Sequence, residues 1–303
     1  KKSLLYYGLP MGCALTVVHA MVPPHPAPAA AAQMFHADLG KTILWGIAIS
    51  IPMAISGGIG YGLWIAKRMF IPVPEIATKD VAVENPPSVP LVLLLLLMPV
   101  TLIFIATFMN LENPKADNLF TLVGHPFSAL LLTTLLTLVC LGAQRAMSRV
   151  QISAMANESL APIGALLAIM GGGGAFKQVI VDSGVGPYAG QLLASSAIPP
   201  ILVAYIVATA LRIAQGSATV AIITAAGIVA PLVAGIPGQS PELLVLALCA
   251  GGTILSHVND AGFWIVNQYL GMTVPETLRT WTVMKVITSV VGIAIILVVD
   301  WLR

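Results

Sequence analysis

The stretch from Leu91 to Met109 reads LVLLLLLMPVTLIFIATFM and contains no charged residue. A helix of about 20 mainly apolar residues is long enough to cross the hydrocarbon core of a bilayer. Further apolar stretches follow one another along the rest of the chain: Leu4–Met21, Ile43–Ala66, Phe127–Ala143, Pro199–Leu211, Ala218–Pro237, Leu243–Ser256 and Ile287–Val299. This pattern predicts an all-α integral membrane protein, a polytopic helical bundle with the lipid bilayer as its main partner.

The composition points to the same class. Of the 303 residues, 58% are hydrophobic and only 9% are charged, whereas soluble domains carry about 25% charged residues. Lipid must therefore solvate much of the outer surface. The formal net charge is +2 and no basic run is present, which excludes a nucleic-acid partner. Cys13, Cys140 and Cys249 lie far apart in apolar stretches, so neither a metal site nor a cofactor is expected.

One apolar stretch, Ala161–Ala175, contains Pro162 and ends in the run Gly171–Gly174. Each glycine destabilises a helix by about 1 kcal/mol relative to alanine. Irregular backbone at membrane depth is tolerated only where protein buries it or where it lines a water-filled cavity. We therefore predict a re-entrant hairpin at about residues 157–183 rather than a plain helix facing lipid.

Two distant segments resemble each other, His19–Pro26 (HAMVPPHP) and His257–Trp264 (HVNDAGFW). Each follows an apolar span and interrupts it with a histidine and residues that disfavour helix. Lys and Arg in short loops mark the cytoplasmic side of a membrane protein. This rule places Pro23–Gly40 outside and Asn259–Thr280, flanked by Lys285, inside. Similar elements of opposite orientation indicate inverted-repeat halves, in which discontinuous helices form the substrate site.

The repeat predicts a division of the chain into three parts. Residues 1–70 form the remainder of a first transporter repeat, and residues 71–90 form a Pro-rich cytoplasmic linker. Residues 91–303 form the second repeat with its hairpin. Because the first part contains no counterpart of the glycine-rich hairpin, we expect the N-terminal part of the first repeat to be missing from this chain.

Several strings resemble the gluconate permease family of proton symporters, within the ion transporter superfamily. They are GGGGAFKQVIVDSGVG (171–186), LRIAQGSATVAIITAAG (211–227), SHVNDAGFW (256–264), TLRTW (277–281) and VPPHPAP (22–28). The resemblance spans nearly the whole chain. It implies a multi-pass protein of the cell (inner) membrane, longer than this chain by several N-terminal spans, that carries gluconate, another sugar acid or D-serine. Ala27 and Ala261 depart from the family's patterns PPHPGP and HVNDPGFW, which leaves the geometry of these turns open.

Polar residues within the apolar stretches are the candidates for substrate binding, because such residues usually face protein or a water-filled cavity. Lys177 suits an anionic substrate, or alternatively a structural pair with Asp182. The string QGSAT at 215–219 is typical of a discontinuous helix, although its small residues also suit close helix packing. The predicted substrate-binding residues are Gly172, Gly173, Gly174, Lys177, Ser217, Thr219, Asn259 and Asp260, with His19, His25, Arg212 and Gln215 as secondary candidates.

Asp182, His257 and Asp260 are the predicted proton-coupling residues, because buried carboxyl groups and histidines can change charge near neutral pH. Each has a structural alternative. Asp182 would suit a helix N-cap, and a lone histidine is often structural. Arg212 could instead extend to a membrane interface, and the segment around His25 could be an ordinary outside loop.

The predicted function is proton-coupled symport of gluconate or a related sugar-acid anion. The alternatives are a permease of the same family for another small carboxylate or D-serine, and a channel, which would need a continuous polar pore. Neither H-E-x-x-H nor G-x-S-x-G occurs, and a hydrolase using His257 and Asp260 would lack a nucleophile, so no enzyme is expected. The sequence leaves open the acid carried, coupling to H⁺ or Na⁺, and whether the protein is a homo-oligomer.

Overall fold

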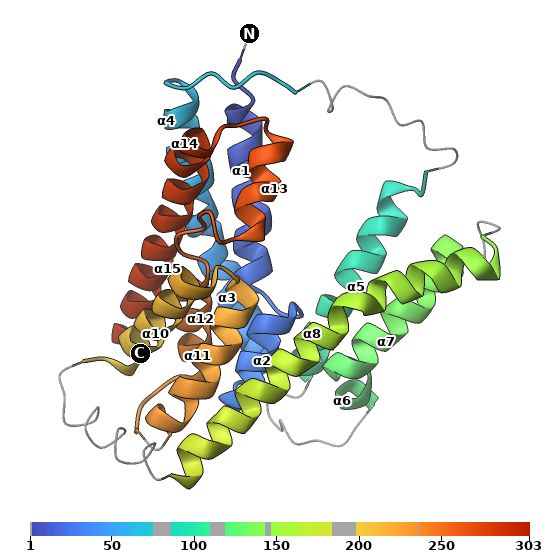
Figure 1. Ribbon diagram of the computed structural model, residues 1–303. Coiled ribbons are helices and arrows are strands. Elements are labelled where there is room, and N and C mark those ends of the chain that lie inside the picture. Colours follow the sequence, from blue (N-terminus) through green and yellow to red (C-terminus); the bar gives the residue numbers. More distant parts are fainter. Residues whose placement is uncertain (1, 75–85, 110–118, 143–146, 184–197, 235) are drawn as a thin grey trace. The chain divides into compact units, whose positions relative to one another are not determined.

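A computed structural model of the chain describes residues 2–74, 86–109, 119–142, 147–183, 198–234 and 236–303. Over these ranges the chain forms helices and no strand, which confirms the all-α class (Figure 1). The α-helices are α1 (Leu5–Met21), α2 (Pro26–Met34), α3 (Leu39–Ala54), α4 (Gly62–Ala66), α5 (Val89–Met109), α6 (Leu119–Gly124), α7 (Pro126–Thr137), α8 (Arg149–Asp182), α10 (Pro200–Gln215), α11 (Ala218–Val233), α12 (Pro241–Gly252), α13 (Ala261–Tyr269), α14 (Val274–Thr277) and α15 (Val283–Trp301). Three further segments are π-helical: η1 (Ile55–Tyr61), η3 (Leu138–Gly142) and η5 (Leu278–Thr282).

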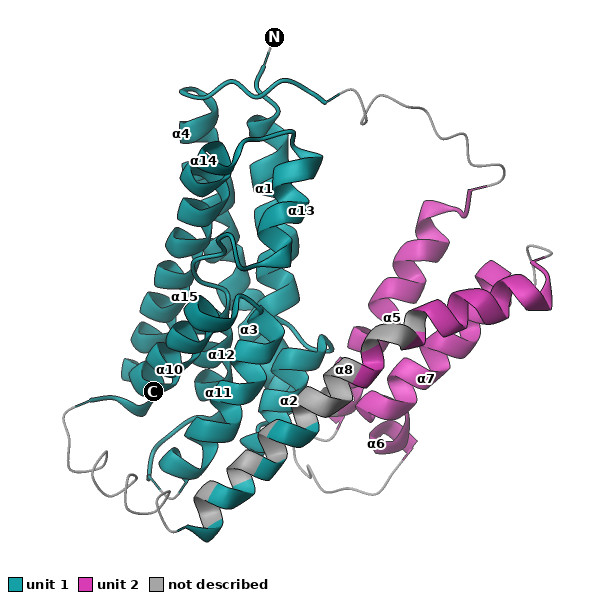
Figure 2. Cartoon of the chain, in the orientation of Figure 1, with its two compact units in different colours: residues 1–79, 169–303 teal, residues 80–168 magenta. Residues whose placement is uncertain are grey.

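The chain divides into two compact units (Figure 2). Unit 1 comprises Lys1–Lys79 and Ile169–Arg303, and unit 2 comprises Asp80–Ala168. In unit 2, α5 packs against α6 and α7. Unit 1 holds the broken helices described below, together with the long helices that surround them. The predicted repeat boundaries at residues 70 and 91 are a different kind of division and stay a prediction.

The long helices have the length and composition of membrane spans. Among the described residues, four helical stretches qualify: Leu5–Met34, Leu39–Ala66, Val89–Ala106 and Val274–Trp301. Large apolar side chains lie on their outer surfaces, such as Leu94 and Leu96 of α5, which are 65% and 67% exposed. Extended exposed apolar surface is unusual in a soluble monomer and indicates a non-aqueous neighbour. The chain is therefore a helical membrane protein, as predicted.

Helix α12 forms the core of unit 1. Its residues from Leu243 to Gly252 are all buried, as expected for a helix that is apolar on every face. It packs against α10, α11, α15 and α3. A helix of 12 residues rises only about 18 Å, compared with the roughly 30 Å hydrocarbon core of a bilayer. A helix this short and this buried ends within the thickness of a membrane.

Three pairs of consecutive helices in unit 1 are interrupted rather than continuous: α1 and α2, α10 and α11, and α12 and α13. The interruptions occur at residues 22–25, 216–217 and 253–260. Each coincides with a segment that the sequence singles out as helix-hostile. Helices therefore end at the places where the sequence predicts interruptions.

The π-helical segment η1 packs unusually close to its neighbours. A Cβ atom on Gly58 would lie 2.9 Å from the Cβ atom of Cys13 in α1, and one on Gly57 would overlap Thr288 in α15. Small residues let helix backbones approach in this way. The close approach fixes α1 and α15 on the two sides of one helix, and both contribute to the site below.

Helix α8 differs from the prediction. It is one continuous helix from Arg149 to Asp182, so the predicted re-entrant hairpin at about 157–183 is wrong for the described backbone. Nothing lies within 4 Å of a Cβ atom built on Gly171 or Gly172. Four glycines lower the helix propensity of this stretch, but they do not end the helix of 34 residues. The helical turns on both sides already supply the nucleus, so the helix only has to propagate through the glycines.

Candidate functional site

The break between α10 and α11 depends on one glycine. Gly216 ends α10 in the left-handed conformation, with φ of 77°, which favours glycine. A Cβ atom at this residue would overlap the backbone carbonyl of Asn259. Ser217 then starts α11 as its N-cap, with its hydroxyl accepting from the backbone N–H of Val220 at 3.3 Å. The helical backbone is therefore interrupted within the string QGSAT, as the sequence predicts.

The break between α12 and α13 lies directly against this first break. The side-chain amide of Asn259 donates to the carbonyl of Ile213 in α10 at 2.9 Å, and a ring nitrogen of His257 lies 3.3 Å from the same oxygen. Asp260 forms the N-cap of α13 and accepts from the N–H of Gly262 at 2.9 Å. The polar residues predicted at 257–260 thus hold two helix ends together.

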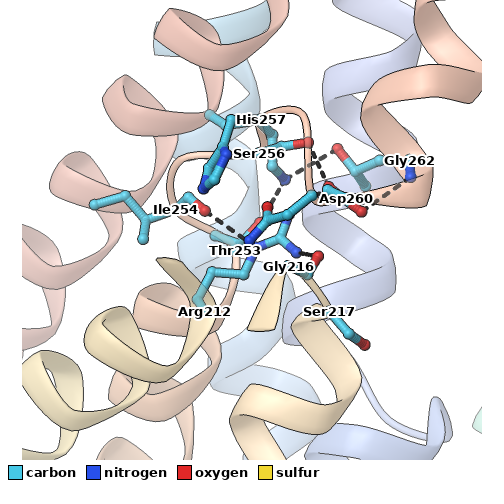
Figure 3. A network of polar contacts seen from close by, with 12 residues as sticks. Arg212, Gly216, Ser217, Thr253, Ile254, Ser256, His257, Asp260 and Gly262 are labelled. Atoms are coloured by element: carbon cyan, nitrogen blue, oxygen red, sulfur yellow. Dashed lines mark hydrogen bonds and ion pairs between the residues drawn. The ribbon is translucent and has the colours of Figure 1, made fainter. Parts of the chain in front are cut away.

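A polar network centred on Arg212 joins these breaks (Figure 3). Its Nε donates to the carbonyl of Ile254 at 3.1 Å, and its other guanidinium nitrogens contact the carbonyl of Gly216 and the carboxylate of Asp260. The Arg212–Asp260 contact is an ion pair of 2.5 Å, and the arginine is only 3% exposed. The side chain of Ser256 donates to the same carboxylate oxygen. Arg212 therefore serves the interior of the protein, and the alternative of a membrane interface is wrong.

The break between α1 and α2 contributes two histidines. The rings of His19 and His25 lie 3.7 Å apart between centroids. His25 is also the N-cap of α2, because its Nδ1 accepts from the N–H of Ala27 at 3.4 Å. The histidines predicted as secondary candidates are therefore paired, and His19 faces the cavity described next.

A cavity of about 390 Å³ lies where these elements meet. Its volume falls within the range of small-molecule sites, roughly 300–1,000 Å³. Every residue that lines it belongs to unit 1. The lining consists of Thr16, His19, Ala20, Arg212, Gln215, Gly216, Ser217, Ala218, Thr219, Thr253, Ser256, Asn259, Asp260, Ala261, Gly262, Trp281 and Lys285.

The lining combines apolar surface with polar side chains and a net positive charge. Among the described lining residues, Arg212 and Lys285 carry positive charges and Asp260 carries a negative one. The first residues of α11 and α13 also line the cavity, and the N-terminus of a helix offers free N–H groups and a partial positive charge. Hydroxyl and amide side chains supply the remaining polar groups. The arrangement can bind a small anion that carries hydroxyl groups.

Comparison with known proteins identifies the family. The family described as "GntP family permease" matches residues 1–302. The chain belongs to this permease family. The resemblance seen in the sequence is thereby confirmed, and with it the prediction of a transporter rather than an enzyme.

The relatives of this permease include named transporters. The chain is 45% identical to a gluconate permease of Pseudomonas aeruginosa, over 98% of this chain and 68% of the relative. It is 42% identical to the high-affinity gluconate transporter of Escherichia coli, over 96% of this chain and 67% of the relative. It is 40% identical to the Gnt-II system L-idonate transporter of the same organism, over 98% and 68%. No solved structure matches this permease.

The cavity brings together part of the predicted site of this permease. Four predicted substrate-binding residues line it, Ser217, Thr219, Asn259 and Asp260, with the secondary candidates His19, Arg212 and Gln215. His25 and His257 contact residues beside it. Whether any of them binds substrate or carries a proton stays a prediction.

The glycine-rich part of the predicted site lies elsewhere. Gly172, Gly173 and Gly174 belong to the continuous helix α8. Asp182, at the end of the same helix, is exposed and accepts from the side-chain amide of Gln178 at 2.8 Å. Asp182 therefore lies at the C-terminal end of α8. The side chain of Lys177 lies outside the described residues.

Sequence reasoning missed Lys285, which is 4% exposed in α15. Its ammonium group donates to the hydroxyl of Thr253 and, at 3.3 Å, to that of Thr16. The centroid of the Trp281 ring lies 5.9 Å from its Nζ. The available signal was a lysine near the start of an apolar helix whose next charged residue is Asp300. We instead interpreted it as a loop charge marking the cytoplasmic side.

Proposed function

We propose that this permease carries gluconate or a related sugar-acid anion across the cytoplasmic membrane by symport with protons. The observation that carries the proposal is the cavity of about 390 Å³, in whose described lining two cations outnumber one carboxylate. The names of the relatives in Pseudomonas aeruginosa and Escherichia coli support the same substrate class. A sugar acid has one carboxylate and a chain of hydroxyl groups, and the lining offers partners for both.

The chemistry of the lining suits a polyhydroxy acid. The positive charges and the N-termini of α11 and α13 favour the carboxylate. Gln215 and Asn259 carry amides, which both donate and accept hydrogen bonds, and Ser217 and Thr219 carry hydroxyls. Such groups complement sugar hydroxyls, which also both donate and accept.

Among the predicted proton-coupling residues, Asp260 has the strongest support, because it lines the cavity and pairs with Arg212. Protonation of this carboxylate would remove the charge that holds α10 against α13, which would couple a proton to a movement of these helices. His257 lies 3.3 Å from the Ile213 carbonyl, and Asp182 lies on α8. Both stay in the proposal as weaker candidates.

We also propose that alternating access uses the interrupted helices and inverted-repeat halves predicted from the sequence. The support is that residues of the break at 253–260 line the cavity, and that His19, whose ring contacts His25 of the break at 22–25, lines it as well. In transporters with inverted repeats, substrate sites lie at such breaks near the membrane midplane.

The test is uptake of labelled gluconate into proteoliposomes. Accumulation that depends on an imposed pH gradient, saturates and shows counterflow supports a proton symporter. Uptake without saturation or counterflow would instead indicate a channel, and dependence on a sodium gradient alone would contradict proton coupling. Competition by gluconate, L-idonate, glycerate and D-serine then ranks the substrates, because another small carboxylate or D-serine is the alternative cargo.

A further inference from the structure

The two cations of the cavity differ in what already binds them. Arg212 donates to the carbonyl groups of Ile254 and Gly216 and forms an ion pair with Asp260. Its positive charge is therefore balanced by a carboxylate of the protein itself. Arg212 therefore holds the ends of α10 and α13 in place. Because Asp260 neutralises its charge, it attracts an anionic ligand only weakly.

Lys285 is as deeply buried as Arg212, with 4% exposure against 3%, but it has only neutral partners. Its ammonium group donates to the hydroxyls of Thr253 and Thr16. Among the described residues, no carboxylate lies within ion-pair distance of it; the carboxylate of Asp260 pairs with Arg212 and acts on Lys285 only at longer range. A buried charge without a direct counter-charge is unfavourable, so an anion from outside the chain would stabilise this ammonium group.

The surroundings of Lys285 are shaped to receive that anion. Thr16 comes from α1, Thr253 follows the end of α12, and Lys285 itself belongs to α15, so the packing of three helices fixes these groups in space. The ammonium has three N–H groups, and the two threonine hydroxyls accept two of them. All three residues line the cavity, and the ring of Trp281 lines it beside the lysine.

We infer that Lys285 is the residue that binds the carboxylate of the transported anion, and that Arg212 is a positioning residue. The inference rests on the proposed function. In this arrangement the carboxylate of the substrate lies at Lys285, and its hydroxyl chain extends toward Gln215, Ser217 and Asn259. Selection of an acid over a neutral polyol then depends on one ammonium group.

The experiment compares gluconate with gluconamide, the neutral amide of the same polyol, as competitors of labelled gluconate and as stabilisers against thermal unfolding of the purified protein in detergent. We expect the unmodified protein to prefer gluconate. In Lys285→Gln the affinity for gluconate should fall at least tenfold, while the affinity for gluconamide stays within about twofold. Lys285→Arg should keep a preference for the acid. Lys41→Gln, which removes an exposed lysine of α3, should behave like the unmodified protein.

Two results would overturn the inference. One is a Lys285→Gln protein that retains the full preference for gluconate over gluconamide. The other is a folded Lys285→Gln protein, judged by size exclusion and thermal unfolding, that loses affinity for both compounds equally, because that pattern indicates a purely structural lysine.

A failure of the proposed function can be distinguished from a failure of this inference. If the unmodified protein binds another acid of the competition panel but not gluconate, the sugar-acid assignment is wrong. Comparing that acid with its amide then tests in the same way whether Lys285 binds the carboxylate. If the unmodified protein binds no carboxylate at all, both the function and the inference are overturned.

Discussion

The Nη2 atom of Arg212 lies 2.5 Å from the Oδ2 atom of Asp260, and this ion pair fastens the end of α10 to the start of α13. Removing one partner of a buried pair leaves an uncompensated charge and typically costs about 3–5 kcal/mol. We therefore expect Asp260→Asn to lower the thermal stability of the purified protein markedly. The double variant Arg212→Met with Asp260→Asn should lose clearly less than the sum of the two single changes. Losses that simply add would contradict the pairing.

Gly216 should not tolerate a side chain. Alanine at this residue would have to adopt φ of 77° and would also overlap the Asn259 carbonyl. The left-handed conformation alone costs an L-residue about 1–2 kcal/mol. Gly238 offers a matched control, because its φ is 79° and nothing lies within 4 Å of a Cβ atom built there. Gly216→Ala should lose more stability than Gly238→Ala and should lose substrate uptake, which Gly238→Ala keeps. Equal effects would show that the contact with Asn259 is unimportant.

The N-cap of α11 should affect both stability and transport. The hydroxyl of Ser217 caps this helix and lines the cavity, and replacing an N-cap serine by alanine costs about 0.5–2 kcal/mol. Ser240 caps α12 in the same way, through the N–H of Leu243, but does not line the cavity. Ser217→Ala and Ser240→Ala should therefore be destabilised alike, whereas only Ser217→Ala should show a raised KM for uptake. A raised KM in both variants would contradict a direct role of Ser217.

Ala261 is a place where proline should stabilise the protein. It is the first residue of α13, where proline is favoured. The preceding Asp260 has φ of −102° and ψ of 124°, which is the extended conformation required before proline. A compatible substitution to proline stabilises by about 0.4–1 kcal/mol, mainly by restricting the unfolded chain. Ala261→Pro should raise the unfolding temperature slightly, and a lowered temperature would show that the N–H group of Ala261 has a needed partner.

Much of the architecture follows from local features of the sequence. Apolar stretches such as Leu91–Met109 predict spans, because a membrane demands a minimum length of apolar helix. The breaks at QGSAT and at 257–260 were predicted because glycine, serine and short polar side chains favour helix ends over helix interiors. These signals lie within a few residues of the feature that they specify. The sequence was for the same reason sufficient to select Ser217, Asn259 and Asp260 as candidates.

The errors have a common physical cause. The run Gly171–Gly174 weakens a helix but does not forbid one, and α8 continues through it from the helical residues on either side. Lys285 follows shortly after Arg279. A positive charge near the start of an apolar span is equally compatible with a loop residue and with a buried residue that binds a ligand. The packing of the helices decides between the two. Here Lys285 is buried, and its ammonium group donates to the hydroxyls of Thr16 and Thr253.

The sequence by itself determined that this chain is a helical membrane protein, which family it resembles, and where three of its helices break. Only the tertiary structure decided that residues at or beside these breaks line one cavity, together with a lysine of α15 and the Arg212–Asp260 pair. The reason is physical: hydrophobic length and helix propensity are properties of neighbouring residues. The surroundings of a buried charge, by contrast, depend on side chains that can lie more than 200 residues apart in the sequence, as Thr16 and Lys285 do.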